Sequence, residues 1–446
     1  MTWPASPLVS RRSAQMFALV IALAGDASAN GRFPATNQFV VQPGNTQHLA
    51  LRTTFGILRS DDGGAHWDWT CESAVGYSGS VDPALSWHRN GTLVAGLFDG
   101  ISQSDEGTCA WTRDAALGKQ VVVDVSTANA DATVLDALTG SYDVNSVVGQ
   151  PEYISAIWSS SPGGRGWSQT SSELPRDVIV ESFDRSAIDP ERIYVTGESE
   201  AGGARAGVLL VSQNGGQTWT RKPFSLDSMG ERGVFLAAID PLRAGRIYLR
   251  TSGSDAGRIL ISDDAGDSFR VIWSGSPPQG FALSADGQTL WVGAFREGLQ
   301  RASTTDMAFT TINRVPIGCL HYAGNTLFAC SLDAYGFAAG RSTDEGQTFD
   351  AILHLNQIQG PRDCPGDGGV PVCASEWPFL KNTVGIEDAV DAGPQPVFDG
   401  GQGGAVQKEA SCKCAVAGAK KKNAPTAWLV TIAIVAFLRP RAARRR

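Results

Sequence analysis

The chain has 446 residues, of which 37 are basic, 45 are acidic and 42% are hydrophobic, with 51 Gly and 22 Pro. This composition excludes a disordered chain, collagen and a coiled coil, and leaves a globular protein. Residues 1–29 carry a charge of +1 and residues 411–446 carry +9, so the net charge of −8 leaves −18 on residues 30–410. Such an acidic body repels phosphate backbones, which argues against nucleic acid as a partner and favours a cation or a neutral polymer.

Residues 1–29 have the pattern of a secretory signal peptide. Arg11 and Arg12 precede an apolar run from Met16 to Gly25, and the small residues Ala27-Ser28-Ala29 follow it. We predict cleavage after Ala29, and hence export of the protein. An N-terminal membrane anchor is the alternative, but a span needs about 20 apolar residues and this run has half that number.

A short motif recurs in the body of the chain: Ser, any residue, Asp or Asn, any residue, Gly, any two residues and an aromatic residue. Complete copies start at Ser60, Ser212, Ser262 and Ser342, and degenerate copies start at Ser104, Ser160 and Thr304. Successive copies start 38 to 56 residues apart. This period matches one four-stranded propeller blade of roughly 40 to 50 residues. We therefore predict an all-β fold, a single seven-bladed β-propeller with its C-terminal disulfide loop over residues 30–385.

The segments around the motif also repeat. Residues 187–190 and 192–195 are matched by residues 238–241 and 246–249. Each blade is therefore predicted to contain a strand, an Asp-Pro or Asn-Gly turn, a second strand, a glycine-containing link, a third strand, the motif and a fourth strand.

The motif resembles the Asp-box, or BNR, repeat of sialidases, sortilin-type propellers, photosystem assembly factors and xyloglucanases. In its hairpin turn the Asp or Asn side chain accepts backbone N–H groups, the glycine takes a positive φ and the aromatic residue packs between blades. The resemblance places the motif at the blade periphery and implies a structural role. The residues concerned are Ser60, Asp62, Gly64 and Trp67; Ser212, Asn214, Gly216 and Trp219; Ser262, Asp264, Gly266 and Phe269; and Ser342, Asp344, Gly346 and Phe349.

Eight cysteines in an exported chain argue for disulfides. Apart from Cys412 and Cys414, they suggest three local pairs: Cys71 with Cys109, Cys319 with Cys330, and Cys364 with Cys373. Zinc is the alternative, but these six residues form no close Cys-x-x-Cys pair and the five histidines are not spaced with them as ligands. We therefore expect no metal and no cofactor.

Sialidases bind the substrate carboxylate with three arginines, the first of which lies in a Tyr/Phe-Arg-Ile-Pro motif. Their nucleophile is a Tyr paired with a Glu, and an Asp is the acid. The segment Gly31-Arg32-Phe33-Pro34 lies where that motif is expected, but it lacks the preceding aromatic residue and no partner arginines can be assigned. Xyloglucanases place their carboxylates between two propellers, and this chain has room for one. His66 and His88 are each conceivable bases, but both are expected at the exposed surface. We therefore predict no catalytic residues.

The function predicted from these observations is a non-enzymatic binding or interaction module for a peptide, a protein or a glycan. A sialidase-like or other glycoside hydrolase is the alternative. The loops of all blades converge on a central face, where we expect the ligand. Residues 136–149 and 198–207 differ most between blades, so specificity is expected there.

Residues 386–411 are rich in Gly, Pro and acidic side chains and predict a flexible spacer. Residues 412–446 contain Cys412-Lys413-Cys414, an apolar stretch from Ala427 to Leu438 and five arginines. This arrangement resembles the myxobacterial C-terminal sorting domain. The resemblance implies attachment to the cell surface or outer membrane through this segment, with processing or lipidation near Cys412 and Cys414 and with release after processing. An ordinary tail anchor is the alternative. We predict a monomer.

Overall fold

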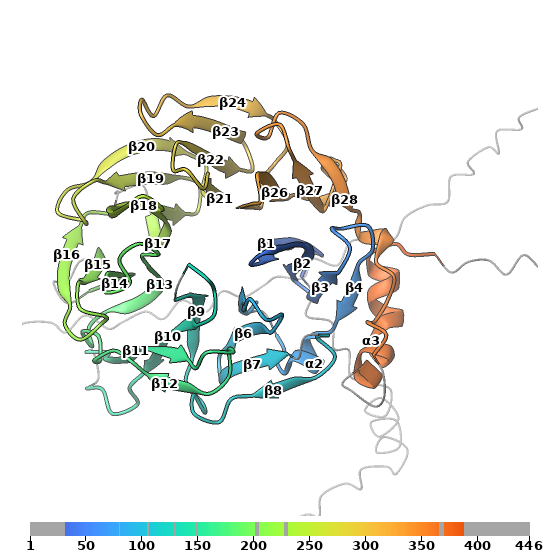
Figure 1. Cartoon of the computed structure of the whole chain (residues 1–446), viewed down its shortest axis with the longest axis horizontal. Coiled ribbons are helices and arrows are strands. Elements are labelled where there is room, and N and C mark those ends of the chain that lie inside the picture. The colour runs from blue at the N-terminus through green and yellow to red at the C-terminus, as the bar shows by residue number, and fades with distance from the viewer. Residues whose placement is uncertain are drawn as a thin grey trace, which may run out of the picture. The chain divides into compact units, whose positions relative to one another are not determined.

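The computed structural model describes residues 32–79, 81–104, 107–128, 130–147, 150–200, 205–226, 231–364 and 370–387. Within these ranges, 28 strands form seven four-stranded antiparallel sheets that are arranged as the blades of a ring (Figure 1). The first strand of each blade contacts the first strand of the next blade, and β1 contacts β25, so the ring is closed. The prediction of an all-β, seven-bladed propeller is confirmed. The predicted signal peptide and C-terminal sorting segment lie outside the described residues.

The blades take their strands in chain order. Blade 1 contains β1 (Thr36–Gln42), β2 (Asn45–Thr53), β3 (Gly56–Ser60) and β4 (Asp68–Thr70). Blade 2 contains β5 (Ala84–Trp87), β6 (Leu93–Leu97), β7 (Gly100–Ser104) and β8 (Trp111–Arg113). Blade 3 contains β9 (Val122–Thr127), β10 (Leu135–Tyr142), β11 (Tyr153–Ser160) and β12 (Trp167–Gln169). Blade 4 contains β13 (Ile179–Arg185), β14 (Ile193–Ser199), β15 (Ala206–Ser212) and β16 (Thr220–Phe224).

Blade 5 contains β17 (Glu231–Asp240), β18 (Arg243–Gly253), β19 (Gly257–Ser262) and β20 (Arg270–Gly275). Blade 6 contains β21 (Pro278–Leu283), β22 (Thr289–Ala294), β23 (Gly298–Ser303) and β24 (Thr310–Asn313). Blade 7 contains β25 (Cys319–Ala323), β26 (Thr326–Cys330), β27 (Ala339–Ser342) and β28 (Asp350–Leu353). The described helices are α2 (Glu72–Val75), α3 (Val370–Thr383) and the short 3-10 helices η1 (Asp333–Tyr335) and η2 (Leu355–Gln357).

The core lies between the blades. The middle strands are buried on both faces because each sheet packs against its two neighbours, and β6 and β14 are buried along their whole length. Their sequences are therefore nearly continuous apolar runs. The side chains of Trp87, Trp291, Tyr194 and Tyr248 are fully buried.

A C-terminal strap, which we define as residues 359–364 and 370–383, joins the end of the chain to blade 1. Residues 359–362 run parallel to β4, where Trp69 N donates to Gly360 O at 2.8 Å and Arg362 N donates to Trp69 O at 3.0 Å. Helix α3 then packs against α2 (Figure 1). The last segment of the propeller is therefore hydrogen-bonded to the outer strand of its first blade.

Three disulfides connect the six described cysteines: Cys71–Cys373, Cys109–Cys364 and Cys319–Cys330. The predicted pair Cys319–Cys330 is confirmed and lies across two adjacent strands. The predicted pairs Cys71–Cys109 and Cys364–Cys373 are wrong, because the strap brings each of its own cysteines to a cysteine of blade 1 or blade 2. The segment that follows Cys364 is also not a loop throughout, since Cys373 lies in α3.

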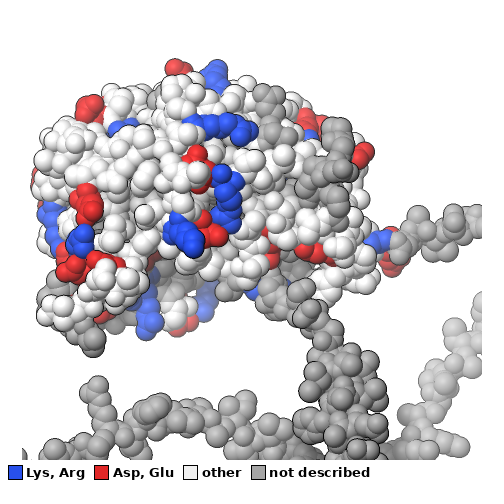
Figure 2. Space-filling model, turned by 90° about the horizontal axis from the view of Figure 1, so that it is seen from below, with Lys and Arg blue, Asp and Glu red and all other residues white. Residues whose placement is uncertain are grey.

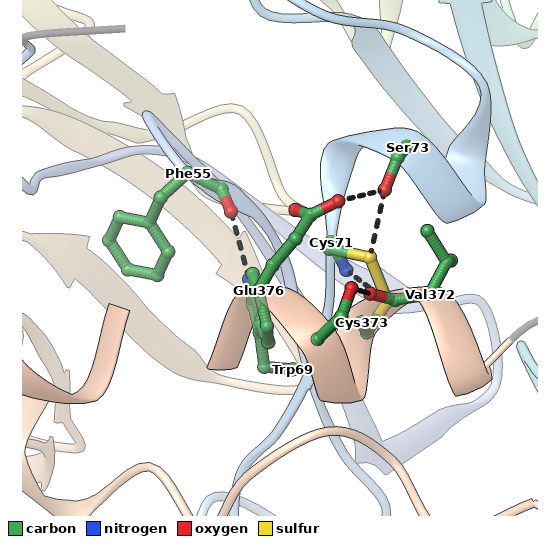
Figure 3. Close-up of a disulfide and its surroundings, with 8 residues drawn as sticks. Phe55, Trp69, Cys71, Ser73, Val372, Cys373 and Glu376 are labelled. Atoms are coloured by element: carbon green, nitrogen blue, oxygen red, sulfur yellow. Dashed lines mark hydrogen bonds between the residues drawn. A yellow bond between two sulfur atoms is a disulfide. The ribbon is translucent and has the colours of Figure 1, made fainter. Parts of the chain in front are cut away.

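Figure 3 shows how the strap meets blade 1 around Cys71–Cys373. Cys71 N donates to Cys373 Sγ at 3.1 Å, and the Ser73 hydroxyl donates to Glu376 Oε1 at 2.5 Å. Nearby, the rings of Trp69 and Trp377 lie 5.8 Å apart. The strap is thus held by main-chain, side-chain and covalent contacts together.

Candidate functional site

The two faces of the ring are built from different connections. One face, here called the motif face, carries the recurrent motif and the turns that join first to second strands. The opposite face, here called the link face, carries the turns that join second to third strands and the links from one blade to the next. A functional residue therefore belongs to a face according to the connection in which it lies.

The motif turns are local hydrogen-bond networks on the motif face. In blade 5, the Ser262 hydroxyl donates to Asp264 Oδ1 at 2.8 Å and accepts from Gly266 N at 2.7 Å, and Asp264 Oδ1 accepts from Ser268 N at 2.8 Å. The copies at Ser60, Ser212 and Ser342 repeat these bonds. The Ser268 hydroxyl and backbone N–H lower the pKa of Asp264 to about 2. This carboxylate stays ionised and is engaged within its own turn.

The glycine of each complete motif copy touches the preceding blade. Gly266 has a φ of 91°, and a Cβ at this position would collide with Leu209 of blade 4. The motif aromatic residues lie at the same boundaries; for example, Trp67 Nε1 donates to Ile352 O of blade 7 at 2.7 Å. The motif residues therefore connect neighbouring blades.

Arg32, the candidate first arginine of a sialidase-type site, is tied to carboxylates. It pairs with Asp82 at 2.8 Å and with Glu72 at 3.3 Å. Tyr77 lies close by, and its buried hydroxyl has no hydrogen-bond partner among the described residues. Burial, with smaller effects of Glu72 and Asp82, raises the pKa of Tyr77. A tyrosine nucleophile needs a lowered pKa or a hydrogen-bonded general base, and the Tyr77 hydroxyl has neither among the described residues.

Tyr77 and Asp82 line a groove of about 810 Å³ on the link face, between the links of blades 1 to 3. Most of its other walls are apolar, including Val81 and Phe98, whose side chains are exposed. The groove thus offers a pre-formed apolar surface with few polar groups.

The two histidines considered as bases have different environments. His66 is exposed, as predicted, and its Nδ1 lies 2.6 Å from Asp62 Oδ2. The prediction that His88 is exposed is wrong, since only 3% of this residue is exposed. Its Nδ1 accepts from Asn90 N at 3.1 Å, so Nε2 donates to Thr133 O at 2.8 Å and links blade 2 to blade 3. His88 is a structural residue.

Four charged side chains near the link-face end of the inner strands were not identified from the sequence: Arg52, Asp124, Glu181 and Arg250. Burial raises the pKa of Asp124 and of Glu181 to about 7. Burial, and secondly the charge of Arg52, lowers the pKa of Arg250 to about 10. Asp124 and Arg52 are each the single charge of a largely apolar strand, and this pattern is the signal by which they could have been found. Glu181 and Arg250 share their strands with other charged residues, so the sequence gives no comparable signal for them.

Neither arginine of this group forms an ion pair with a described residue. Arg52 donates to Asn37 Oδ1 at 2.7 Å and to Pro83 O at 3.2 Å. Arg250 donates to Pro278 O at 3.3 Å, and its guanidinium lies 4.3 Å from the ring centre of Phe235. Guanidinium groups that are desolvated without a bound carboxylate favour an anionic or strongly polar ligand.

A second link-face cavity, of about 510 Å³, lies between blades 5 and 6. It is lined by Arg250, Arg296, Phe235 and Phe295, together with Ser252, Gly253, Ser254, Ser276, Pro277 and Gln279. A further hollow of about 450 Å³ is lined by Arg232 and residues 252–254. Among the residues that the structure describes, no acidic residue lines either cavity.

Unlike these two cavities, the edge of the propeller seen in Figure 2 carries charges of both signs. Basic and acidic side chains are interspersed there among uncharged residues.

In the described ranges, no group of three His, Cys, Asp or Glu side chains is arranged to hold a metal ion. No helix among the residues that the structure describes is long and apolar enough to cross a membrane. Cys412 and Cys414 lie outside those residues.

The sequence matches no protein-family model and no curated protein. Solved structures are similar to the chain in fold. A GH74 enzyme of Niastella koreensis is 15% identical, with a TM-score of 0.35 over 72% of this chain and 63% of that chain. The extracellular domain of the putative one component system BT4673 of B. thetaiotaomicron is 13% identical, with a TM-score of 0.45 over 68% of this chain and 38% of that chain. The Cps50 (Swd1) β-propeller domain of Myceliophteria thermophila is 12% identical, with a TM-score of 0.40 over 68% of this chain and 94% of that chain.

Proposed function

We propose that this protein is an exported, surface-attached β-propeller that binds a ligand on its link face and catalyses no reaction. The observation that carries the proposal is the pair of pre-formed link-face cavities, one largely apolar and one lined by arginines and phenylalanines. Cavities that combine apolar walls with a few polar groups are the usual ligand sites of proteins. The three disulfides support export, because such bonds persist in oxidising compartments.

The arrangement of titratable groups supports binding rather than catalysis. Arg32 is engaged by two carboxylates, and Tyr77 is held in its neutral form by burial. The carboxyl of Glu181 is influenced by Glu198, Arg205 and Arg250, and that of Asp124 by Asp184 and Arg52. Both carboxyls act on Arg250, but neither shifts the pKa of the other, so they do not form a directly coupled acid and base pair.

A glycoside hydrolase remains the second candidate because Asp124 and Glu181 have pKa values of about 7. A carboxyl that is protonated near neutral pH can act as a general acid. This second function requires the carboxyl itself, so the substitution of either residue by its amide would abolish it.

The two functions are separated by one set of measurements on the full-length protein. Binding is screened on glycan and peptide arrays, and turnover is measured with aryl sialosides, other aryl glycosides and xyloglucan. We expect binding without turnover, and unchanged binding in the motif-face control Asp264→Asn. Turnover that is lost in Glu181→Gln or Asp124→Asn would establish the hydrolase and reject the non-enzymatic function.

We propose further that residues 412–446 attach the propeller to the cell surface. Deletion of these residues should release the folded propeller into the medium, and Cys412→Ser with Cys414→Ser should leave unprocessed protein in the inner membrane. Mass spectrometry of the surface-extracted protein tests this directly. An intact C-terminus through Arg446 with both cysteines unmodified would identify an ordinary tail anchor instead.

A further inference from the structure

The arginine-lined cavity between blades 5 and 6 differs in charge from the rest of blade 5. Elsewhere in that blade, arginines are neutralised: Arg258 is bound by Glu231, Arg243 pairs with Asp240 at 2.9 Å, and Arg246 pairs with Asp263. The rule for these three guanidinium groups is thus one close carboxylate each, whereas the exposed Arg270 has its nearest carboxylate, that of Asp263, at 3.9 Å.

The arginines of the cavity depart from this rule. Among the described residues, Arg250 donates to a backbone carbonyl, lies over the Phe235 ring and forms no ion pair. Arg296 is exposed, and its nearest carboxylate is that of Asp255, also exposed, at 3.9 Å. Arg232, in the adjoining hollow, is exposed and forms no ion pair with a described residue. Of the described carboxylates nearby, Asp255 approaches only Arg296, and Glu297 accepts from Ser276 and is influenced by Arg296. Arg250 and Arg232 are thus gathered around the cavity without a paired carboxylate among the described residues.

The charges that face Arg250 from neighbouring elements are Arg52, Asp124 and Glu181. Arg52 opposes the positive charge of Arg250, and the two carboxyls favour it. Because burial raises the pKa of both carboxyls to about 7, they are incompletely ionised near neutral pH and only partly compensate the arginines. An external anion in the cavity would complete the compensation.

The other residues that line the cavity indicate what kind of molecule carries this anion. The ring of Phe295 is 44% exposed and offers a flat apolar surface at the rim. The hydroxyls of Ser252, Ser254 and Ser276 donate to Arg232 O, Asp255 Oδ2 and Glu297 Oε2, so their oxygens face the cavity as acceptors. The Gln279 side-chain amide donates to Pro277 O at 3.2 Å, which leaves its oxygen available as a further acceptor. An apolar face, several hydroxyls and one anionic group are combined in an acidic sugar.

On the basis of the link-face binding function proposed above, we infer that the cavity between blades 5 and 6 binds the carboxylate of a hexuronate residue through Arg250 and Arg296, with the sugar ring against Phe295. Since residues 30–410 carry −18 overall, the fitting ligand is a polymer in which uronates are separated by neutral sugars. A dense polyanion would be repelled by the surrounding surface.

The test compares methyl glucuronide with methyl glucoside, which differ in the carboxylate, by calorimetry or saturation-transfer NMR on the full-length protein. We expect the glucuronide to bind more tightly, and to lose about tenfold or more in affinity in Arg250→Gln and in Arg296→Gln, since each variant removes a charge-assisted hydrogen bond. Arg296 is 71% exposed, so its variant folds normally even if Arg250→Gln does not. The matched control is Arg270→Gln, an exposed arginine on the outer strand of blade 5.

The following outcomes would overturn the inference. If the glucoside binds as tightly as the glucuronide, the carboxylate plays no part in binding. If a glutamate-rich peptide binds more tightly than the glucuronide, the ligand is a peptide and not an acidic sugar. Glucuronide binding that is unchanged in Arg296→Gln and Arg250→Gln would move the site elsewhere. If array ligands bind while both methyl glycosides fail, the inference falls and the binding function stands; if nothing binds, or turnover is detected, the binding function falls as well.

Discussion

The disulfide Cys71–Cys373 is expected to be the main covalent lock of the strap on blade 1, and its removal tests how the ring is held closed. The perturbation is the double variant Cys71→Ser with Cys373→Ser. The bond joins residues 302 positions apart, but Cys109–Cys364 already joins residues 255 positions apart within that interval. With the second bond intact, the extra loop closed by Cys71–Cys373 contains only about 47 residues.

The chain-entropy relation for a loop of this length gives a loss of about 4 kcal/mol in the free energy of unfolding. For a cooperative unit of about 350 residues the unfolding entropy is about 0.7 kcal/mol/K, so Tm should fall by about 5 to 6 °C. The matched control is Cys319→Ser with Cys330→Ser, which opens a loop of 11 residues within blade 7. The same relation gives about 3 kcal/mol and a fall of about 4 °C for this control.

The assay is thermal unfolding followed by tryptophan fluorescence under non-reducing conditions, with the remaining disulfides verified by peptide mass mapping. Additional removal of Cys109–Cys364 should lower the stability by a further 5 to 6 kcal/mol or about 8 °C, because the remaining strap is then held without a covalent bond. A Tm that is unchanged in the Cys71 and Cys373 variant, or a larger fall in the blade 7 control, would refute the strap as the lock of the ring.

Three further predictions concern the propeller body. Asp264→Ala should lower Tm without changing ligand binding, because the Ser268 N–H loses its acceptor, whereas Asp350→Ala, at an exposed position, should leave Tm unchanged; loss of binding at unchanged Tm would contradict this. Gly266→Ala should destabilise more than Gly79→Ala, since both glycines have positive φ but only Gly266 would place a Cβ against another blade. Thermal stability should rise as pH falls from about 8 to about 5, because burial holds the folded-state pKa values of four carboxyls, Asp124, Glu181, Glu72 and Asp184, above their unfolded values. The buried His321, whose pKa is lowered to about 4, acts in the opposite direction but is one group against four. A flat profile, or one whose slope is the same in Glu181→Gln, would contradict this.

The number of blades could be predicted because each motif is stabilised within a few residues. The Ser262 hydroxyl and the Asp264 carboxylate satisfy donors no more than four positions away, so the sequence pattern itself carries the structural requirement. The period of the motif then counts the blades without any knowledge of how they meet. Local hydrogen bonding is the reason that this part of the fold could be predicted from the sequence.

Contacts between distant segments could not be predicted in the same way. The pairing of Cys71 with Cys373 depends on a parallel strand contact with β4 that has no local pattern. His88 follows a strand and precedes a turn, which indicated exposure, but its partner Thr133 belongs to the next blade. Residues 136–142, expected in a variable loop, form most of β10, and both ends of the second expected loop, residues 198–199 and 206–207, lie in β14 and β15.

The topology of the described ring explains why a strap is needed to keep it closed. Every sheet is made of four consecutive strands, so no blade combines strands from the two ends of the chain. The contact of β1 with β25 closes the ring by packing between blades rather than by a shared sheet. Such a closure can open locally when the packed side chains separate, whereas a hydrogen-bonded segment with two disulfides to blades 1 and 2 keeps the last blade within reach of the first. Because both link-face cavities are formed between blades, a ring that stays closed also keeps these cavities in shape before a ligand arrives, and a pre-formed site binds with a smaller ordering cost.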